Sequence, residues 1–133
     1  MSFSNYLEVG LLNQIVGKTD YTMPTAFVAL FVGDPTDAGS GGAEVSGVSY
    51  ARVETAGADW NAAASGSISN ANDIEFPEAG GAWGTVDYFA IYDASTAGNL
   101  LASGVLDTSK AVGIGDTPKF AGGTPGALVI TLD

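Results

Sequence analysis

The chain has 133 residues, of which 46% are hydrophobic and only 14% are charged, and it contains neither His nor Cys. Its four Lys and Arg residues are outnumbered by 15 Asp and Glu residues, which gives a net charge of −11. This composition excludes an imidazole base, a thiolate nucleophile, a disulfide and a thiol or imidazole metal ligand. It also argues against nucleic acid and membrane surfaces as partners, because both attract Lys and Arg. We therefore expect a protein that is not an enzyme.

The first predicted element is an α-helix over residues 5–16. The N-cap is expected either at Asn5, which has Glu8 three residues later, or at Ser4. Gly17 is placed to end the helix in the left-handed conformation. An apolar helix of this kind must pack against its own domain or against a neighbouring subunit. Its apolar residues recur every three or four positions: Leu7, Val9, Leu11, Leu12, Ile15 and Val16.

From residue 26 onward the pattern changes to short strands separated by Gly, Pro, Asn, Asp and Ser. Residues 26–32 are apolar on both faces, which is typical of a central strand that is covered on both sides. Residues 36–46 contain three glycines and predict a long loop. A hairpin is expected from residues 86–93 and 100–106, which bracket a short Gly-containing connection. Further short strands are predicted at 50–55, 73–76, 111–114, 119–120 and 128–132, with 61–72 as a weak edge strand or a loop.

Seven or eight short strands at this spacing predict a mainly β fold. We expect an antiparallel β-sandwich of jelly-roll or immunoglobulin-like type over residues 26–132, preceded by the one helix at 5–16. Neither a repeat of fixed period nor a domain boundary is visible in the sequence. Residues 1–133 are therefore expected to form a single domain.

Oxygen ligands are the one metal chemistry that the composition offers. Asp34 and Asp37 flank a Pro-Thr dipeptide, and Asp73 and Glu75 lie two residues apart on one predicted strand. The sequence has no calcium loop of the EF-hand type, and Asp34 followed by Pro35 is typical of a turn. We therefore expect no cofactor, and Ca²⁺ is the only ion for which the sequence leaves room.

Aromatic and half-exposed residues supply the candidate contacts. Tyr88 and Tyr92 share one face of their strand, opposite Phe89 and Ile91, so one face belongs to the core and the other is half-buried or lies at an interface. An interface is favoured over a sugar-binding platform, because Tyr buries area there while keeping a hydrated hydroxyl. The predicted interaction residues are Leu7, Leu11 and Ile15 on the helix, Tyr50 and Arg52 on the strand at 50–55, and Tyr88 and Tyr92.

A series of segments spread over nearly the whole chain points to a family. They are SNYLE (4–8), LLN (11–13), FVALF (27–31), DPTDAG (34–39), EVSG (44–47), SYAR (49–52), IEFP (74–77), WGTV (83–86), IYDA (91–94) and GNLL (98–101), followed by Gly104. This series resembles a family of small tailed-bacteriophage virion proteins that are often labelled as tail-fibre proteins. The family offers no catalytic or binding motif, so the resemblance implies a structural virion component and assigns no site residues.

Three functions are compatible with this resemblance. Size, charge and β content favour a capsid decoration or cement protein that stabilises the head surface, with the excess acidic charge toward solvent. The first alternative is a tail or tail-fibre-associated structural or adaptor protein. The second is a carboxylate glycosidase acting on host-surface sugars, since paired carboxylates can hydrolyse glycosides.

The expected partners are copies of the same chain and other virion proteins, such as the major capsid protein or tail proteins. A homotrimer suits a capsid three-fold axis. The N-terminal helix or the loop at 39–42 is the expected arm onto a neighbour. The first residues lack the basic start and apolar run of a secretory signal, so we expect synthesis in the host bacterial cytoplasm and assembly into the virion.

Overall fold

The computed structural model describes residues 1–132, so Asp133, the last residue of the predicted domain, lies outside the described residues. The predicted mainly β, antiparallel fold with one N-terminal α-helix is confirmed. The main sheet has the strand order β1-β8-β7-β2-β3, and β4 also pairs with β2. Its strands are β1 (Ser2–Phe3), β2 (Ala26–Val32), β3 (Ala43–Glu44), β4 (Val53–Thr55), β7 (Gly84–Tyr92) and β8 (Leu100–Val112).

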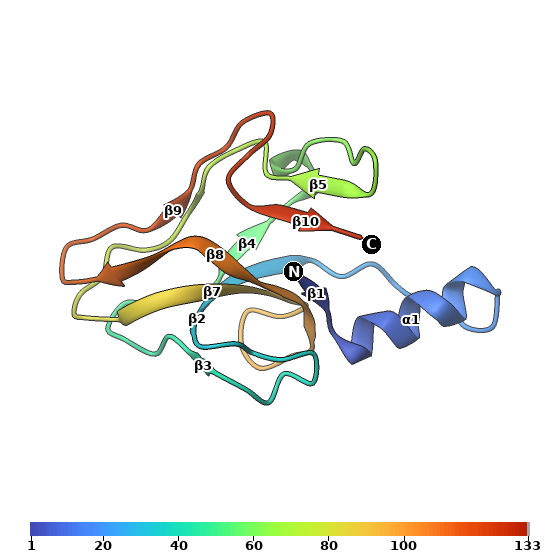
Figure 1. Ribbon diagram of the computed structural model, residues 1–133, viewed down its shortest axis with the longest axis horizontal. Coiled ribbons are helices and arrows are strands. Elements are labelled where there is room, and N and C mark those ends of the chain that lie inside the picture. The colour runs from blue at the N-terminus through green and yellow to red at the C-terminus, as the bar shows by residue number, and fades with distance from the viewer. Residues whose placement is uncertain (133) are drawn as a thin grey trace.

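Two antiparallel ribbons of two strands each lie above the main sheet in Figure 1. One is formed by β5 (Ser67–Ser69) and β10 (Val129–Thr131), and the other by β6 (Ile74–Glu75) and β9 (Lys119–Phe120). A short 3₁₀ helix, η1 (Gly57–Asp59), follows β4. The α-helix α1 (Asn5–Ile15) extends beyond the edge of the sheet at the right of Figure 1.

The main core lies on the face of the sheet that the ribbons cover. Because side chains alternate along a strand, Val28 and Leu30 of β2 and Phe89 and Ile91 of β7 point to this face. The ribbon segments complete the cluster with Ile74, Phe76, Leu128 and the partly buried Phe120.

The opposite face of the sheet carries a second, smaller cluster. Its buried members are Ala29, Phe31, Ala90 and Leu100, and Tyr88 and Tyr92 pack against them. This arrangement confirms that the two tyrosines share a face opposite Phe89 and Ile91.

Several predicted boundaries are wrong. The predicted strand at 50–55 begins only at Val53. The expected short strand at 111–114 is not separate, because residues 111–112 are the end of β8 and residues 113–114 lie outside any strand. Val86 pairs with Lys110 whereas Tyr88 pairs with Val105, so residues 106–109 bulge out of the ladder. Residues 107–109 of this bulge are polar and interrupt the alternation along β8. For this reason the sequence did not predict β8 as one continuous strand. The two-residue strands β1 and β3 are too short to leave a pattern, and β3 lies inside the predicted loop at 36–46.

A buried asparagine connects the ribbon segments to one another. The side chain of Asn70 is fully buried, and its Oδ1 accepts a hydrogen bond from the backbone N–H of Leu128 at 2.8 Å. Its Nδ2 donates to three backbone carbonyls, those of Asn72, Phe120 and Ala121, at 2.9–3.1 Å. A Cβ on Gly126 would lie only 1.9 Å from the Asn70 carbonyl oxygen, so only glycine permits this approach. Asn70 thus fixes segments that have little regular hydrogen bonding of their own.

We expect Asn70→Ala to lower the free energy of unfolding by about 3 kcal/mol, because it leaves buried backbone groups without a partner. Urea denaturation followed by Trp fluorescence measures this change. Asn13→Ala in α1 is the control, since the Asn13 side chain makes no hydrogen bond within residues 1–132, and it should stay within about 0.5 kcal/mol of the parent. Equal effects of the two substitutions would contradict the role given to Asn70.

Candidate interaction surface

The start of α1 is fixed to strand β8. The hydroxyl of Ser4 accepts a hydrogen bond from the backbone N–H of Leu7 at 3.1 Å, which makes Ser4 the N-cap. The same hydroxyl donates to the carbonyl of Leu100, and the Ser4 N–H donates to the carbonyl of Leu101 at 2.9 Å. Of the two caps that the sequence allows, the structure therefore uses Ser4.

The helix ends at Ile15, one residue before the predicted end. Gly17 takes the left-handed conformation, with φ of +67°, as the sequence predicts. Its N–H donates to the carbonyl of Gln14, and the N–H of Lys18 donates to the carbonyl of Asn13, which is the Schellman pattern. Lys18 is thereby held directly at the C-terminal end of the helix.

One face of α1 is covered by the segment that returns to β2. The ring of Tyr21 lies edge-on to the ring of Tyr6, with the centroids 6.5 Å apart. The N–H of Tyr21 donates to Oε1 of Gln14 at 2.6 Å. A Cβ at Gly10 would meet the Tyr21 ring at 2.7 Å, so the absence of a side chain allows the segment to approach.

Another face of α1 is left open to solvent. Of the three predicted helix residues, Leu7 packs against the main core, Leu11 is half-buried and Ile15 is exposed. The open face, called the apolar strip below, consists of Val9, Leu12, Ile15 and Val16, which are 60%, 64%, 77% and 74% exposed. An apolar strip of this kind on a protein surface marks an interaction site.

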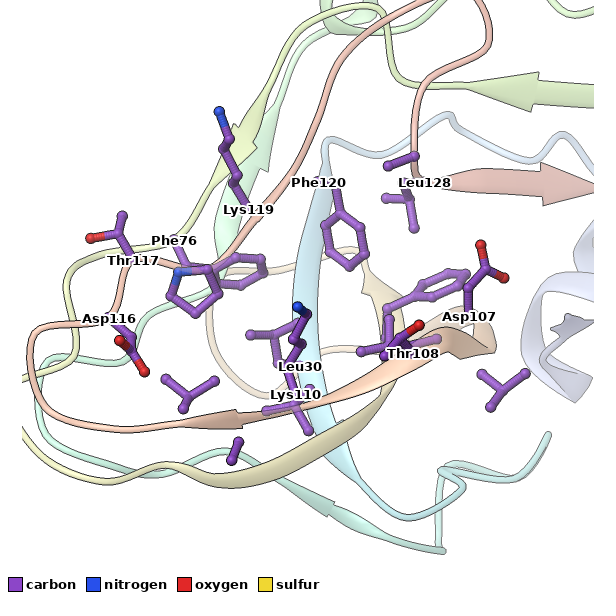
Figure 2. A pocket seen from close by; sticks show the side chains of 18 of the residues that line it. Leu30, Phe76, Asp107, Thr108, Lys110, Asp116, Thr117, Lys119, Phe120 and Leu128 are labelled. Atoms are coloured by element: carbon purple, nitrogen blue, oxygen red, sulfur yellow. The ribbon is translucent and has the colours of Figure 1, made fainter.

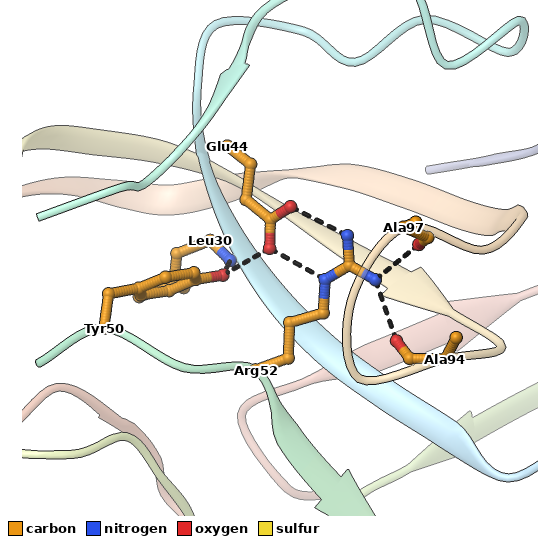
Figure 3. Close-up of polar contacts among 6 residues, drawn as sticks. All are labelled: Leu30, Glu44, Tyr50, Arg52, Ala94 and Ala97. Atoms are coloured by element: carbon orange, nitrogen blue, oxygen red, sulfur yellow. Dashed lines mark hydrogen bonds and ion pairs between the residues drawn. The ribbon is translucent and has the colours of Figure 1, made fainter.

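Arg52 holds together three segments that are distant in sequence (Figure 3). Its Nε and Nη2 donate to the two carboxylate oxygens of Glu44, both at 2.8 Å, in the bidentate geometry that only arginine offers. Its Nη1 donates to the carbonyls of Ala94 and Ala97, also at 2.8 Å. The guanidinium carbon lies 3.7 Å from the centre of the Tyr92 ring, and the Arg52 side chain is only 6% exposed. Arg52 is therefore a buried structural contact.

Tyr50 fills a gap along the edge of β2. On the edge of β2 that faces away from β7, β4 pairs with residues 26–28 and β3 pairs with residues 31–32. The N–H of Leu30 lies between these two pairings and has no strand partner on this edge. The Tyr50 hydroxyl accepts the Leu30 N–H at 3.1 Å and donates to Oε1 of Glu44 at 2.9 Å. Burial raises the pKa of Tyr50 well above its ordinary value; the Leu30 N–H acts in the opposite direction, and the Glu44 charge adds to the rise.

The structure thus brings together three of the predicted interaction residues, Tyr50, Arg52 and Tyr92. The sequence prediction missed Glu44, the partner of Tyr50 and Arg52, because no local residue pattern shows that β3 and β4 pair with the same edge of β2. Tyr88 lies on the same sheet face as Tyr92 and packs against the small cluster. These residues stabilise the domain, and the apolar strip of α1 remains as the exposed candidate for binding.

A cavity of about 600 Å³ lies between β8 and the ribbon segments. Its floor is apolar and includes Leu30, Phe76, Phe89, Phe120 and Leu128. Figure 2 shows Asp116 and Asp107 at opposite ends of this view, with the side chains of Leu30 and Lys110 between them. In this view other side chains of the lining separate the two carboxylates.

Two of the acidic residues considered for calcium, Asp34 and Asp73, bind other groups of the chain. The Asp34 carboxylate accepts the N–H of Thr36 at 2.8 Å, as expected for a turn. Asp73 accepts the N–H of Gly122 and forms an ion pair with Lys119, and these contacts lower its pKa. Across the part of the chain that the structure describes, no three His, Cys, Asp or Glu side chains lie together where they could hold a metal ion. The expectation of no cofactor, with Ca²⁺ as the one ion for which the sequence leaves room, stays a prediction.

None of the helices within residues 1–132 has the length and apolar content that crossing a membrane requires.

Comparison with protein families gives a match to the family described as "Podophage GP4 fiber I protein gp80", over residues 2–127. The chain belongs to this fibre-protein family. Membership confirms the predicted resemblance to phage tail-fibre proteins and makes the chain a virion protein. No curated protein matches the chain.

In this fibre-family protein, we expect Arg52→Ala to lower the free energy of unfolding by about 3 kcal/mol, because Glu44 and two carbonyls lose their donor. This is the low end for a buried ion pair, since the Glu44 side chain is still 27% exposed. The stability of Arg52→Lys should lie between that of the parent and that of Arg52→Ala. Lys keeps the positive charge but cannot donate two parallel hydrogen bonds to the carboxylate. Lys110→Ala, at an exposed cation with no ion pair within the described chain, is the control. Thermal or urea unfolding measures all four proteins.

The buried hydroxyl of Tyr50 predicts loss of stability in alkali. A free tyrosine ionises near pH 10, whereas Tyr50 in the folded protein ionises at a higher pH. The folded state therefore keeps a proton that the unfolded state loses, and stability falls as the pH rises above about 10. Tyr50→Phe should lower stability at pH 8 by about 1–3 kcal/mol, because Leu30 loses its acceptor. Its deficit relative to the parent should shrink as urea denaturation is repeated up to pH 11, and a constant deficit would refute this.

Proposed function

We propose that the chain is a structural component of the phage tail fibre, or an adaptor at the tail, that catalyses no reaction and acts by contacting other virion proteins. The observation that carries this proposal is the family match over residues 2–127, which covers both α1 and the sheet. Because the match includes α1 as well as the β region, the exposed helix is part of what the family shares.

The absence of a catalytic role is supported by the way the chain uses its polar groups. Glu44 is the carboxylate beside the most buried cation, and it is already bound by Arg52 and Tyr50. Asp59 and Asp73 accept backbone N–H groups, which lowers the pKa of each carboxyl and keeps it ionised rather than available as an acid. A carboxylate glycosidase needs a pair of acids that approach one sugar bond from two sides. In Figure 2 the side chains of Leu30 and Lys110 lie between Asp107 and Asp116, the two acids that line the cavity.

Contacts with neighbours are expected through apolar and small polar residues. The net charge of −11 leaves most carboxylates without a cation, and unpaired carboxylates are costly to remove from water. The apolar strip of α1 is free of this cost, since Glu8 is the one charged residue of the helix. It is therefore the surface that we assign to contacts within the virion.

Capsid decoration is the competing proposal, and it rests on chain size, acidity and β content. The family description names a fibre protein, which favours the tail over the head. Both proposals require contacts with virion proteins, so the location in the particle separates them.

Labelling the chain in intact virions and imaging the particles tests the location. We expect the label at the tail, and a copy number far below that of the major capsid protein when both are quantified in purified particles. Uniform labelling of the head, with copies in proportion to the capsid protein, would overturn the fibre proposal in favour of decoration. A soluble control, in which labelled protein is added to finished particles, distinguishes assembly from adhesion.

A further inference from the structure

The apolar strip follows one side of α1 from Val9 to the C-terminal end of the helix. Val9, Leu12 and Val16 are separated by three and four residues, the spacing at which side chains line up on one helix face, and Ile15 lies beside them. The other faces of α1 are occupied by Tyr21 on one side and by the core contact of Leu7 on another. The strip is thus the part of the helix that remains without a partner among the described residues.

The two charges that flank the strip have opposite signs and lie at opposite ends. Glu8 is in the first turn of α1, and the Schellman pattern holds Lys18 directly after the last turn. Lys18 is one of only four cations in the chain, and it makes no ion pair within residues 1–132. If a second α1 lies antiparallel against the strip, each Glu8 comes opposite the Lys18 of the other helix. A parallel arrangement would instead bring Glu8 beside Glu8.

We propose that α1 of one copy pairs antiparallel with α1 of a second copy, across a two-fold axis near Leu12. In such an isologous contact each residue meets the symmetry-related surface, so Leu12 lies near its own copy and Val9 lies near Val16. The contact is built from apolar side chains at its centre and from two Glu8–Lys18 pairs at its ends. The antiparallel direction also places the positive end of each helix dipole beside the negative end of the other.

The part of each copy outside α1, called the body below, carries most of the acidic residues. The bodies of two copies therefore repel each other, and the antiparallel pairing keeps them apart. In Figure 1 the sheet lies at the N-terminal end of α1, and the C-terminal end of the helix points away from it. In an antiparallel pair the two bodies therefore lie at opposite ends of the helices. The 11 residues of α1 span about 16 Å, which is about twice the Debye length at physiological salt. A trimer with parallel helices would place three bodies side by side.

Single cysteines give a direct test of this geometry, because the chain contains none. In the full-length protein under mild oxidation, Leu12→Cys should form a disulfide-linked dimer. Val9→Cys and Val16→Cys should each crosslink poorly alone but form a mixed dimer when combined, since these positions meet across the axis. Self-crosslinking of Val9→Cys and of Val16→Cys without a mixed product would show parallel helices and overturn the proposal. Absence of all crosslinks would overturn it as well.

Charge exchange provides a second readout by sedimentation equilibrium. Glu8→Lys and Lys18→Glu should each weaken dimerisation by about tenfold, because like charges then meet at both ends. The double substitution E8K/K18E should dimerise more tightly than either single variant. Single variants that weaken the dimer without recovery in the double variant would refute the antiparallel pairing.

A matched pair of substitutions separates loss of the interface from loss of the fold. Leu12→Glu adds a charge in the strip and should abolish the dimer. Gln14→Glu adds the same charge on the face toward Tyr21, where a carboxylate oxygen can still accept the Tyr21 N–H, and should leave the dimer intact. Near-ultraviolet circular dichroism reports whether the sheet and its Trp residues stay folded in both. Equal loss of the dimer in the two variants would contradict the role of the strip. The pairing does not depend on whether the chain is located at the tail or at the head.

Discussion

The burial of β2 on both faces is the constraint on which the rest of the structure depends. Val28, Ala29, Leu30 and Phe31 are each at most 5% exposed, so the sheet needs a cover above and below this strand. The ribbon segments supply one cover with large apolar side chains, and the second cluster with its tyrosines supplies the other. Since burial of apolar surface is the dominant favourable term in folding, the short and irregular segments are ordered by what they cover.

Two polar contacts make this cover compatible with a buried backbone. Tyr50 supplies the acceptor that a strand would have offered to Leu30, and Asn70 supplies donors and an acceptor to the ribbon segments. Arg52 then ties the Tyr50 region to the turn after β7 through Glu44. Every buried side-chain polar atom among residues 1–132 has a hydrogen-bond partner, so the irregular parts are as well satisfied as the sheet. The buried polar groups are thus satisfied within the chain, and in our proposal the exposed helix makes the contacts with neighbours.

The distribution of charge fits this division between body and arm. Most carboxylates of the chain lie outside α1 and remain hydrated, which keeps the acidic body from binding other acidic surfaces. The helix has an apolar strip and one charge of each sign at its ends. In our proposal the strip favours association with a second helix, and the charges favour the antiparallel orientation.

The sequence by itself determined the elements whose signals are local. The periodicity of the helix and the glycine that ends it, the apolar run of β2 and the alternation that sets Tyr88 against Phe89 are properties of neighbouring residues, and the structure has them as predicted. The tertiary structure alone decided that Arg52 meets Glu44, that Asn70 joins the ribbon segments and that β8 continues through its bulge. It also decided which side of the helix stays exposed. These outcomes depend on which distant segments pack against β2. The spacing of residues along the chain does not show these long-range contacts.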